Sequence, residues 1–189
     1  MQLDIYNISH PIIKILSNIT KQKKPDAITS LYCYKNIGLL IIYEVLRKYV
    51  VIKPVYIKSL HSTKLLNLID RNKKYIILTN FYDNYEMITD IKILLPNIDI
   101  IDISNNNKDN SQIETKHIGE NTKTTEIIIL TKELSNIKVL ALIKYLTLEE
   151  EIPPYNIKIA CIIAYEDVLT NLSYEHPDIK IYTTEIGHN

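Results

Sequence analysis

The stretch "IKIACIIAYEDVLTNLSYEHPDIKIYTTEI", residues 157–186, decides the fold class of this chain. It begins with an Ile-rich apolar run at 157–163, continues with a segment of helical periodicity at 166–174 and ends with a strand pattern at 179–184. Apolar periodicity is the main signal that separates helices from strands. A strand, a helix and a strand in this order predict a right-handed βαβ unit with two parallel strands.

The same alternation is found upstream. Short strand patterns occur at 75–80 and 98–103 with a helix near 84–95 between them, and a helix near 134–147 follows the run "EIIIL" at 126–130. That run is apolar after its first residue, as expected of a strand buried on both faces of a parallel sheet. We therefore predict an α/β fold with a mostly parallel central sheet of about five strands and helices on both faces.

Two further helices are expected before the first of these strands. Ser9 and Pro11 are start signals for one helix, with these residues on its apolar side: Ile12, Ile13, Leu16 and Ile19. Residues 27–50 predict a long helix with these residues facing inward: Leu31, Ile37, Ile41 and Val45. The polar, aperiodic segment 104–124 is expected to be a flexible or surface excursion from a single domain spanning 1–189.

Composition excludes several classes of function. The chain has 22 basic and 22 acidic residues, so it lacks the cationic excess of a nucleic-acid binder. No apolar run is long enough to predict a membrane span. Cys33 and Cys161 lie in apolar stretches and are expected to be buried free thiols. The five histidines lack zinc-ligand spacing, so we expect neither a metal nor a cofactor.

Residue usage points to an AT-rich genome. Ile, Asn, Lys and Tyr, whose codons are AT-rich, are abundant, whereas the chain has 3 glycines and only two arginines, Arg47 and Arg71. A single Phe does not fit this bias. The usage favours a plastid-encoded protein.

Residues 157–186 resemble the uracil phosphoribosyltransferase family, with its Ile-Lys strand, helix, His-Pro-Asp turn and Tyr-Thr strand in gapless order. "HPIIKILSNI" (10–19) is similar to the family's first helix, and "NIGLLIIYEVLRK" (36–48) to its helix ending in Tyr-Glu. Residues 75–100 align by position. The resemblance implies a type I phosphoribosyltransferase-like fold, usually found as a dimer.

The resemblance implies two phosphate-binding segments that this sequence does not retain. Active members follow the third strand with acidic residues and a Thr-Gly-Gly turn that cradles the ribose phosphate, where this chain has "TKELSNIKVL" (131–140). They grip the diphosphate with an arginine and two glycines, where this chain has "TNFYDNYEM" (79–87). The residues of the former phosphate and diphosphate sites are then Thr79, Tyr82, Asn84, Glu86, Thr131, Glu133 and Ser135. We expect no catalytic residue among them, because Tyr does not replace a bidentate arginine and bulky side chains block close phosphate approach.

In active members the Tyr-Thr strand also leads into a Gly-rich tail that recognises uracil. This sequence ends with "GHN" (187–189). We therefore expect a degenerate, C-terminally truncated homologue without the uracil-binding tail.

The 14 tyrosines suggest protein contacts, since Tyr combines apolar area with a polar tip. Codon bias is the alternative explanation for their number. The candidate partner-contact residues are Tyr82, Tyr85 and Tyr34, and the first two are expected to line the former diphosphate pocket.

These observations predict a catalytically inactive homologue that acts as a structural or interaction subunit of a larger plastid assembly, in the chloroplast stroma or peripheral to an organellar complex. We expect protein partners or a homodimer, and no nucleic acid. One alternative is an active enzyme of pyrimidine salvage that forms UMP from uracil and phosphoribosyl diphosphate with Mg²⁺. Another is a non-catalytic nucleotide-sensing module, and a cytoplasmic location is the alternative to the plastid.

Overall fold

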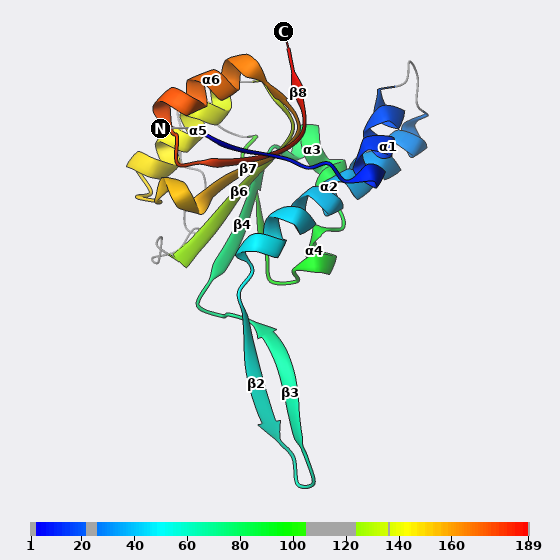
Figure 1. Ribbon diagram of the computed structural model, residues 1–189, viewed down its shortest axis with the longest axis vertical. Helices are drawn as coiled ribbons and strands as arrows, with labels where there is room; N and C mark the ends of the chain where they lie inside the picture. The colour runs from blue at the N-terminus through cyan, green and yellow to red at the C-terminus, as the bar shows by residue number, and fades with distance from the viewer. Residues whose placement is uncertain (1–2, 22–25, 105–123, 136, 189) are drawn as a thin grey trace.

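Parallel strands form the central sheet, in the order β1-β8-β7-β6-β4-β5 (Figure 1). The computed structural model describes residues 3–21, 26–104, 124–135 and 137–188. The strands of this sheet are β1 (Asp4–Asn7), β4 (Lys74–Thr79), β5 (Asp99–Asp102), β6 (Thr125–Leu134), β7 (Ile157–Tyr165) and β8 (Lys180–Gly187). Every pairing within the sheet is parallel among the described residues, which confirms the predicted α/β class.

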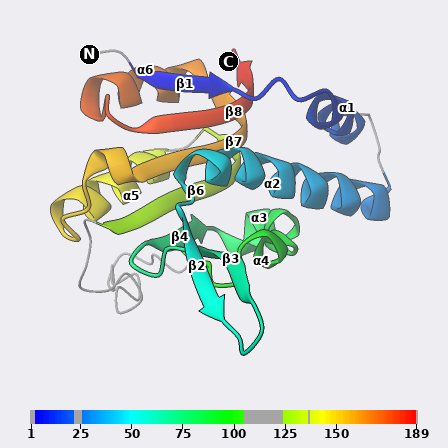
Figure 2. The same cartoon turned by 60° about the horizontal axis from the view of Figure 1, so that its bottom comes forward.

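Helices cover both faces of the sheet (Figure 2). One face carries α1 (Pro11–Thr20), α2 (Ala27–Tyr49), α3 (Phe81–Ile88) and α4 (Ile91–Leu94). The other face carries α5 (Ile137–Leu148) and α6 (Glu166–Glu175), and a short 3-10 turn, η3 (Pro154–Asn156), precedes β7.

The central strands are apolar on both faces, as the run at 126–130 predicts. Ile127 and Ile129 of β6 pack in the cluster under α5 and α6, whereas Ile128 and Leu130 pack in the cluster under α2. Side chains alternate between the faces of a strand, so a continuous apolar run supplies two cores at once. The two clusters therefore share the same strands.

The predicted strand and helix positions are confirmed with small shifts at their ends. The helix expected near 84–95 begins earlier, at Phe81, because the side chain of Asn80 caps its first turn, and it is divided into α3 and α4. The strand at 126–130 continues to Leu134, and α5 follows from Ile137. The edge strand β1 was not predicted from the sequence.

Pro11 begins α1, as predicted, but other predicted details of the N-terminal helices are wrong. His10, and not Ser9, caps α1, because its Nδ1 atom accepts a hydrogen bond from the backbone N–H of Ile12 at 3.3 Å. Ile12 and Leu31 were expected to face inward but are 53% and 41% exposed. Ile12 and Leu31 lie on the sides of α1 and α2 that face away from the core.

An antiparallel hairpin, formed by β2 (Ile52–Lys58) and β3 (Thr63–Ile69), projects from the body of the molecule (Figures 1 and 2). We call these two strands and their turn the arm, residues 52–69. The sequence analysis did not predict it. Asp70 anchors its base, since the Asp70 backbone N–H donates to the carbonyl oxygen of Val51 at 2.9 Å and its carboxylate pairs with Lys53 at 2.8 Å.

Other predictions have mixed outcomes. Cys33 and Cys161 are free and buried, as expected. Most of the polar segment 104–124 lies outside the described residues. In the part of the chain that the structure describes, no helix is long and apolar enough to cross a membrane.

Candidate functional site

The carboxyl ends of β4, β5 and β6 meet at one edge of the sheet, where open α/β sheets bind their ligands. Thr79 at the end of β4 lies opposite Asp102 of β5. The candidate residues 79–86 begin with the last residue of β4 and continue into α3. The candidate residues 131–135 are the last four residues of β6 and the residue after it. The resemblance to phosphoribosyltransferases predicts that this edge is where phosphate would bind.

The segment that aligns with the ribose-phosphate cradle is part of a regular strand. Thr131, Glu133 and Leu134 continue the β6 ladder beside β7, with Leu134 paired to Ala164. Leu134 is fully buried, and the Thr131 hydroxyl donates to the carbonyl oxygen of Glu133 at 3.0 Å. A phosphate cradle needs a loop whose backbone N–H groups converge on the anion. Over 131–134 the backbone forms a sheet ladder instead.

The N-terminus of α3 is already capped by side chains. Asn80 accepts a hydrogen bond from the Tyr82 backbone N–H at 2.9 Å, and Asp102 accepts one from the Phe81 backbone N–H at 3.0 Å. Burial raises the pKa of Asp102, but hydrogen bonds from Phe81 and Ser104 outweigh it and hold the pKa below its usual value. The first N–H groups of a helix favour anions. Here a carboxylate of the same chain occupies that position.

Lys132 joins α3 to the end of β6. Its backbone N–H donates to Asn84 Oδ1 at 2.9 Å, and its ammonium group donates to Glu86 Oε2 at 2.8 Å. The same ammonium lies 4.3 Å from the ring centroid of Tyr34 on α2. We call Tyr34, Asn84, Glu86 and Lys132 the Lys132 cluster. It connects three elements of the site edge.

The charge of Lys132 is matched within the cluster. Burial raises the pKa of Glu86, but the hydrogen bond and charge of Lys132 outweigh it and lower that pKa below its usual value. Lys132 is the single cation in segments 79–87 and 131–135, which also carry Asp83, Glu86 and Glu133. A diphosphate at this edge would meet more carboxylates than cations, and the Lys132 ammonium is already paired.

The remaining candidate residues lie apart from this cluster. The Thr79 hydroxyl is buried and donates to the carbonyl oxygen of Leu130 at 2.7 Å, which ties β4 to β6. Tyr82 and Tyr85, which are expected to line the former diphosphate pocket, lie on α3 and are 92% and 61% exposed. Ser135 is exposed at the end of β6. The exposure of Tyr82 leaves it accessible to a partner.

The sequence analysis did not select Lys132, Asn80 or Asp102. Lys132 and Glu86 are 46 residues apart, and nothing in their spacing pairs them. Asn80 carried a usable signal, because an Asn directly before a helical segment is a preferred N-cap.

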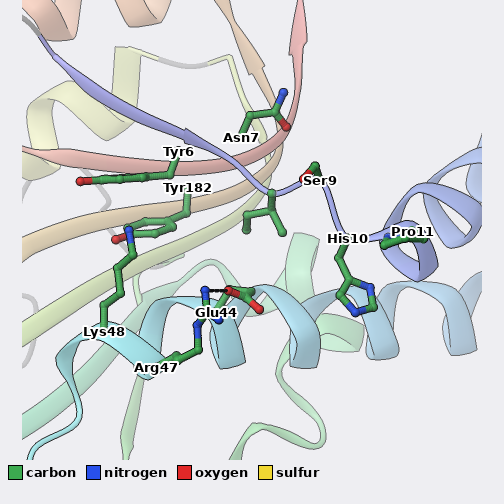
Figure 3. Close-up of a pocket in the computed structure, with 10 residues that line it drawn as sticks. Tyr6, Asn7, Ser9, His10, Pro11, Glu44, Arg47, Lys48 and Tyr182 are labelled. Atoms are coloured by element: carbon green, nitrogen blue, oxygen red, sulfur yellow. Dashed lines mark ion pairs between the residues drawn. The ribbon is translucent and has the colours of Figure 1, made fainter.

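A groove of about 410 Å³ lies between the end of β1 and α2 (Figure 3). Tyr6 and Tyr182 stack there with centroids 4.8 Å apart, and the Lys48 ammonium lies 3.6 Å from the centroid of Tyr6. Arg47 and His10 also line the groove, and Arg47 pairs with Glu44 at 2.9 Å. No group of three or more metal-ligating side chains gathers anywhere in the described ranges.

Comparison with known proteins identifies the family. Residues 7–189 match the uracil phosphoribosyltransferase family. A protein of the red alga Porphyra purpurea named uracil phosphoribosyltransferase homolog is 30% identical over 99% of this chain and 90% of its own length. A protein of the same name from the red alga Pyropia yezoensis is 27% identical over 100% of this chain and 91% of its own length.

A solved structure supports the fold. The AQ2163 protein from Aquifex aeolicus is similar with a TM-score of 0.76 and 15% identity, over 98% of this chain and 88% of that chain. The family match spans nearly the whole sequence and agrees with the parallel sheet described above. The chain therefore belongs to the uracil phosphoribosyltransferase family.

Proposed function

We propose that this protein is a non-catalytic member of its family that acts as a structural or interaction subunit of a larger assembly. The proposal rests on one observation: at the carboxyl ends of β4, β5 and β6, the backbone groups that would bind phosphate are already bonded within the chain. The end of β6 is a regular strand through Leu134, and the α3 N-terminus is capped by Asn80 and Asp102. A phosphorylated substrate needs converging donors at both places.

The fold has been retained while this edge is occupied by the chain's own side chains. Lys132 bonds to Asn84 and Glu86. Admitting a diphosphate would require Asp102 or Glu86 to give up its hydrogen bonds, at a cost of about 1.5–3 kcal/mol for each charged hydrogen bond. The packing thus supports a role for the folded domain itself.

Binding of phosphoribosyl diphosphate tests the proposal. At 100 times Kd a ligand stabilises the native state by about 2.7 kcal/mol, which raises the melting temperature of a domain of this length by roughly 5–10 °C. We expect no rise with millimolar phosphoribosyl diphosphate and Mg²⁺ beyond that given by pyrophosphate at matched ionic strength. A ligand-specific rise, or formation of UMP from added uracil, would favour the active-enzyme alternative.

The groove between β1 and α2 favours a second candidate function, a non-catalytic nucleotide-sensing module. Arg47, Lys48 and His10 line the groove with a single carboxylate, that of Glu44. Glu44 already pairs with Arg47, so Lys48 and His10 are the side chains left to donate to a ligand. Uridine nucleotides, assayed by thermal melt, should then raise the melting temperature of the native chain. The double variant Arg47→Glu/Lys48→Glu should lose that rise, and a control variant Lys14→Glu should keep it. If no nucleotide gives a rise, this candidate function is excluded.

We further propose that the assembly lies in a plastid, with the cytoplasm as the alternative. The AT-rich residue usage and the two red-algal relatives support this location. Localisation of the native protein by immunogold labelling would decide it. Labelling confined to the cytoplasm would exclude the plastid.

A further inference from the structure

The edge strand β1 leaves one side of its backbone without a partner strand. β8 is its neighbour in the sheet, and no described strand lies on its other side. The backbone N–H of Ile8 donates to the carbonyl oxygen of Thr183 at 2.8 Å, so the even-numbered residues here bond toward β8. Backbone groups alternate between the two edges of a strand. The N–H and C=O groups of Ile5 and Asn7 therefore point away from the sheet, and no backbone group in the described ranges pairs with them.

This edge lacks most of the features that prevent a strand from pairing with another chain. Proline, lysine and bulges are common on protected edges. Residues 4–8 read Asp-Ile-Tyr-Asn-Ile, and β1 keeps a continuous register against β8. Ile5 is 38% exposed beside the edge. Because β1 has only 4 residues, backbone bonds alone would hold a partner weakly, and side chains must add to the contact.

The groove between β1 and α2 lies beside this edge (Figure 3). Tyr6, which comes from β1 itself, lines the groove and stacks on Tyr182 of β8. Neighbouring strands lie about 4.8 Å apart, and side chains two residues apart share a face of the sheet. A side chain placed opposite Tyr6 on an added strand would therefore enter the groove.

Lys48 and His10 supply donors to this groove. The Lys48 ammonium lies 3.6 Å from the ring centroid of Tyr6, and no carboxylate in the described part of the chain pairs with it. Glu44, the carboxylate that lines the groove, pairs with Arg47. The His10 Nδ1 atom accepts a backbone hydrogen bond in the α1 cap, so the neutral ring carries its proton on Nε2 and donates from there. The groove thus has two donors to offer to an incoming acceptor.

These donors specify the chemistry of the added strand. A carboxylate is the side-chain group that accepts from both an ammonium and an imidazole N–H, and such charged bonds are the strong ones. Side chains alternate between the faces of a strand, so the neighbours of an acidic residue in the groove would lie on the opposite face, beside Ile5. Ile5 favours apolar side chains there. The matching segment alternates acidic and apolar residues.

We propose that an extended segment of a partner protein, alternating acidic and apolar residues, adds to the sheet as a strand beside β1. Its backbone bonds to the outward groups of Ile5 and Asn7, and one acidic side chain enters the groove and binds Lys48 and His10. Its apolar side chains pack against Ile5. In this mode of recognition, backbone hydrogen bonds supply affinity and alternate side chains supply specificity.

This inference rests on the proposed function, since it names the partner chemistry of an interaction subunit, and the two fail separately. Binding of phosphoribosyl diphosphate would overturn the non-catalytic proposal and leave the β1 edge untouched. Absence of peptide binding would overturn the inference and leave the bonded residues at the ends of β4, β5 and β6 untouched.

Fluorescence anisotropy with the native chain tests the charge preference. The probes are two fluorescein-labelled peptides of about eight residues, one alternating Glu and Val and the other alternating Lys and Val. The Glu-Val peptide should bind at least about tenfold more tightly than the Lys-Val peptide. No binding of the Glu-Val peptide at about 1 mM, or equal binding of the two peptides, would overturn the proposal.

Backbone methylation separates strand addition from simple charge attraction. N-methylating the Glu residues removes the N–H groups of one edge of the peptide, and N-methylating the Val residues removes those of the other edge. A strand beside β1 uses one edge, so one of the two methylated peptides should bind at least about tenfold more weakly than the other. Equal affinities would mean that side chains alone hold the peptide, which contradicts strand addition.

Substitutions in the chain test whether the peptide lies on β1. Asn7→Pro removes an outward N–H and Asn7→Ala keeps it, so the Pro variant should bind the Glu-Val peptide at least about tenfold more weakly than the Ala variant. Lys48→Glu should weaken binding by about tenfold or more, and the control Lys92→Glu, exposed on α4, should leave Kd unchanged. Far-UV circular dichroism checks that each variant is folded. If Lys48→Glu removes a rise in melting temperature with uridine nucleotides but leaves peptide binding unchanged, the groove is a nucleotide site and the proposal is wrong.

Discussion

Lys158 and Glu126 form a buried ion pair at the start of β7 and β6. Lys158 is 1% exposed, and its ammonium also lies 4.2 Å from the ring centroid of Tyr49. Burial lowers the pKa of Lys158, although Glu126 opposes the shift. Lys73 reaches the other oxygen of Glu126 at 3.2 Å from a more exposed position. The pair joins the starts of β6 and β7, and through Tyr49 it contacts the end of α2.

Breaking this pair should cost more than replacing it. Glu126→Leu leaves the buried ammonium of Lys158 without its partner and should lower the free energy of unfolding by about 3–5 kcal/mol. Lys158→Met should cost less, because Glu126 keeps its ion pair with Lys73. The double variant should lie much closer to the native chain, because two packed apolar groups replace the pair. Urea unfolding measures all three.

Lys73 provides the matched control. Its side chain is 32% exposed, so Lys73→Met should cost less than about 1 kcal/mol. If the double variant loses as much stability as the two single variants added together, Lys158 and Glu126 have no coupling energy, and the prediction is wrong.

Residues such as Lys158 and Lys132 mark the limit of sequence reasoning at this scale. The loss of the family's Arg and Gly residues is visible at 79–87 and 131–135, so a degenerate site could be predicted. The side chains that close it could not, because Lys132 meets Glu86 and Asn84 only after β6 and α3 come together. A charged residue within an apolar strand also gives no sign of its partner.

At the scale of elements, α2 and α3 make an unusually close contact at Gly38. A Cβ atom added there would lie 2.3 Å from the carbonyl oxygen and 2.7 Å from the Cα of Met87. Both atoms belong to the backbone of α3, so neither yields as the end of a side chain would. The absence of a side chain at residue 38 sets the position of α3.

Gly38→Ala should therefore destabilise the protein despite its better helix propensity. Propensity alone favours Ala by about 1 kcal/mol, whereas overpacking costs about 1–3 kcal/mol or more when backbone must move. We expect a net loss of stability in urea unfolding. Asn36→Ala, exposed on the same helix, should change stability by less than about 0.5 kcal/mol. A stabilised Gly38→Ala variant would show that α3 moves at little cost.

The elements themselves were predictable wherever burial governs the pattern. The strands of the sheet core and the helices α2, α5 and α6 have strong apolar signals, because each packs on one or two apolar surfaces. The arm has apolar residues on both faces with Pro54 in its first strand, so it shows neither the alternation of a half-buried strand nor a continuous apolar run. The edge strand β1, Asp-Ile-Tyr-Asn, is mostly exposed, so burial imposes no apolar pattern on it.

At the scale of the whole molecule, two apolar clusters share one sheet. The cluster with α5 and α6 and the cluster with α2 both draw on β4, β6, β7 and β8. Removing either set of helices would expose one face of strands that the other set still covers. The clusters are thus expected to form one cooperative unit, as the expected single domain over 1–189 requires.

Because the two clusters share the same strands, the protein should unfold in a single thermal transition, whichever cluster a mutation weakens. Leu146→Ala on α5 and Ile41→Ala on α2 remove fully buried side chains from opposite faces. Each should cost about 2–5 kcal/mol, which lowers the melting temperature by roughly 4–20 °C. Far-UV and tyrosine near-UV circular dichroism should report the same midpoint for each variant. Ile93→Ala, 74% exposed, should leave the midpoint nearly unchanged. If one variant separates the two signals into different midpoints, the two faces of the sheet unfold independently and the single-domain expectation is wrong.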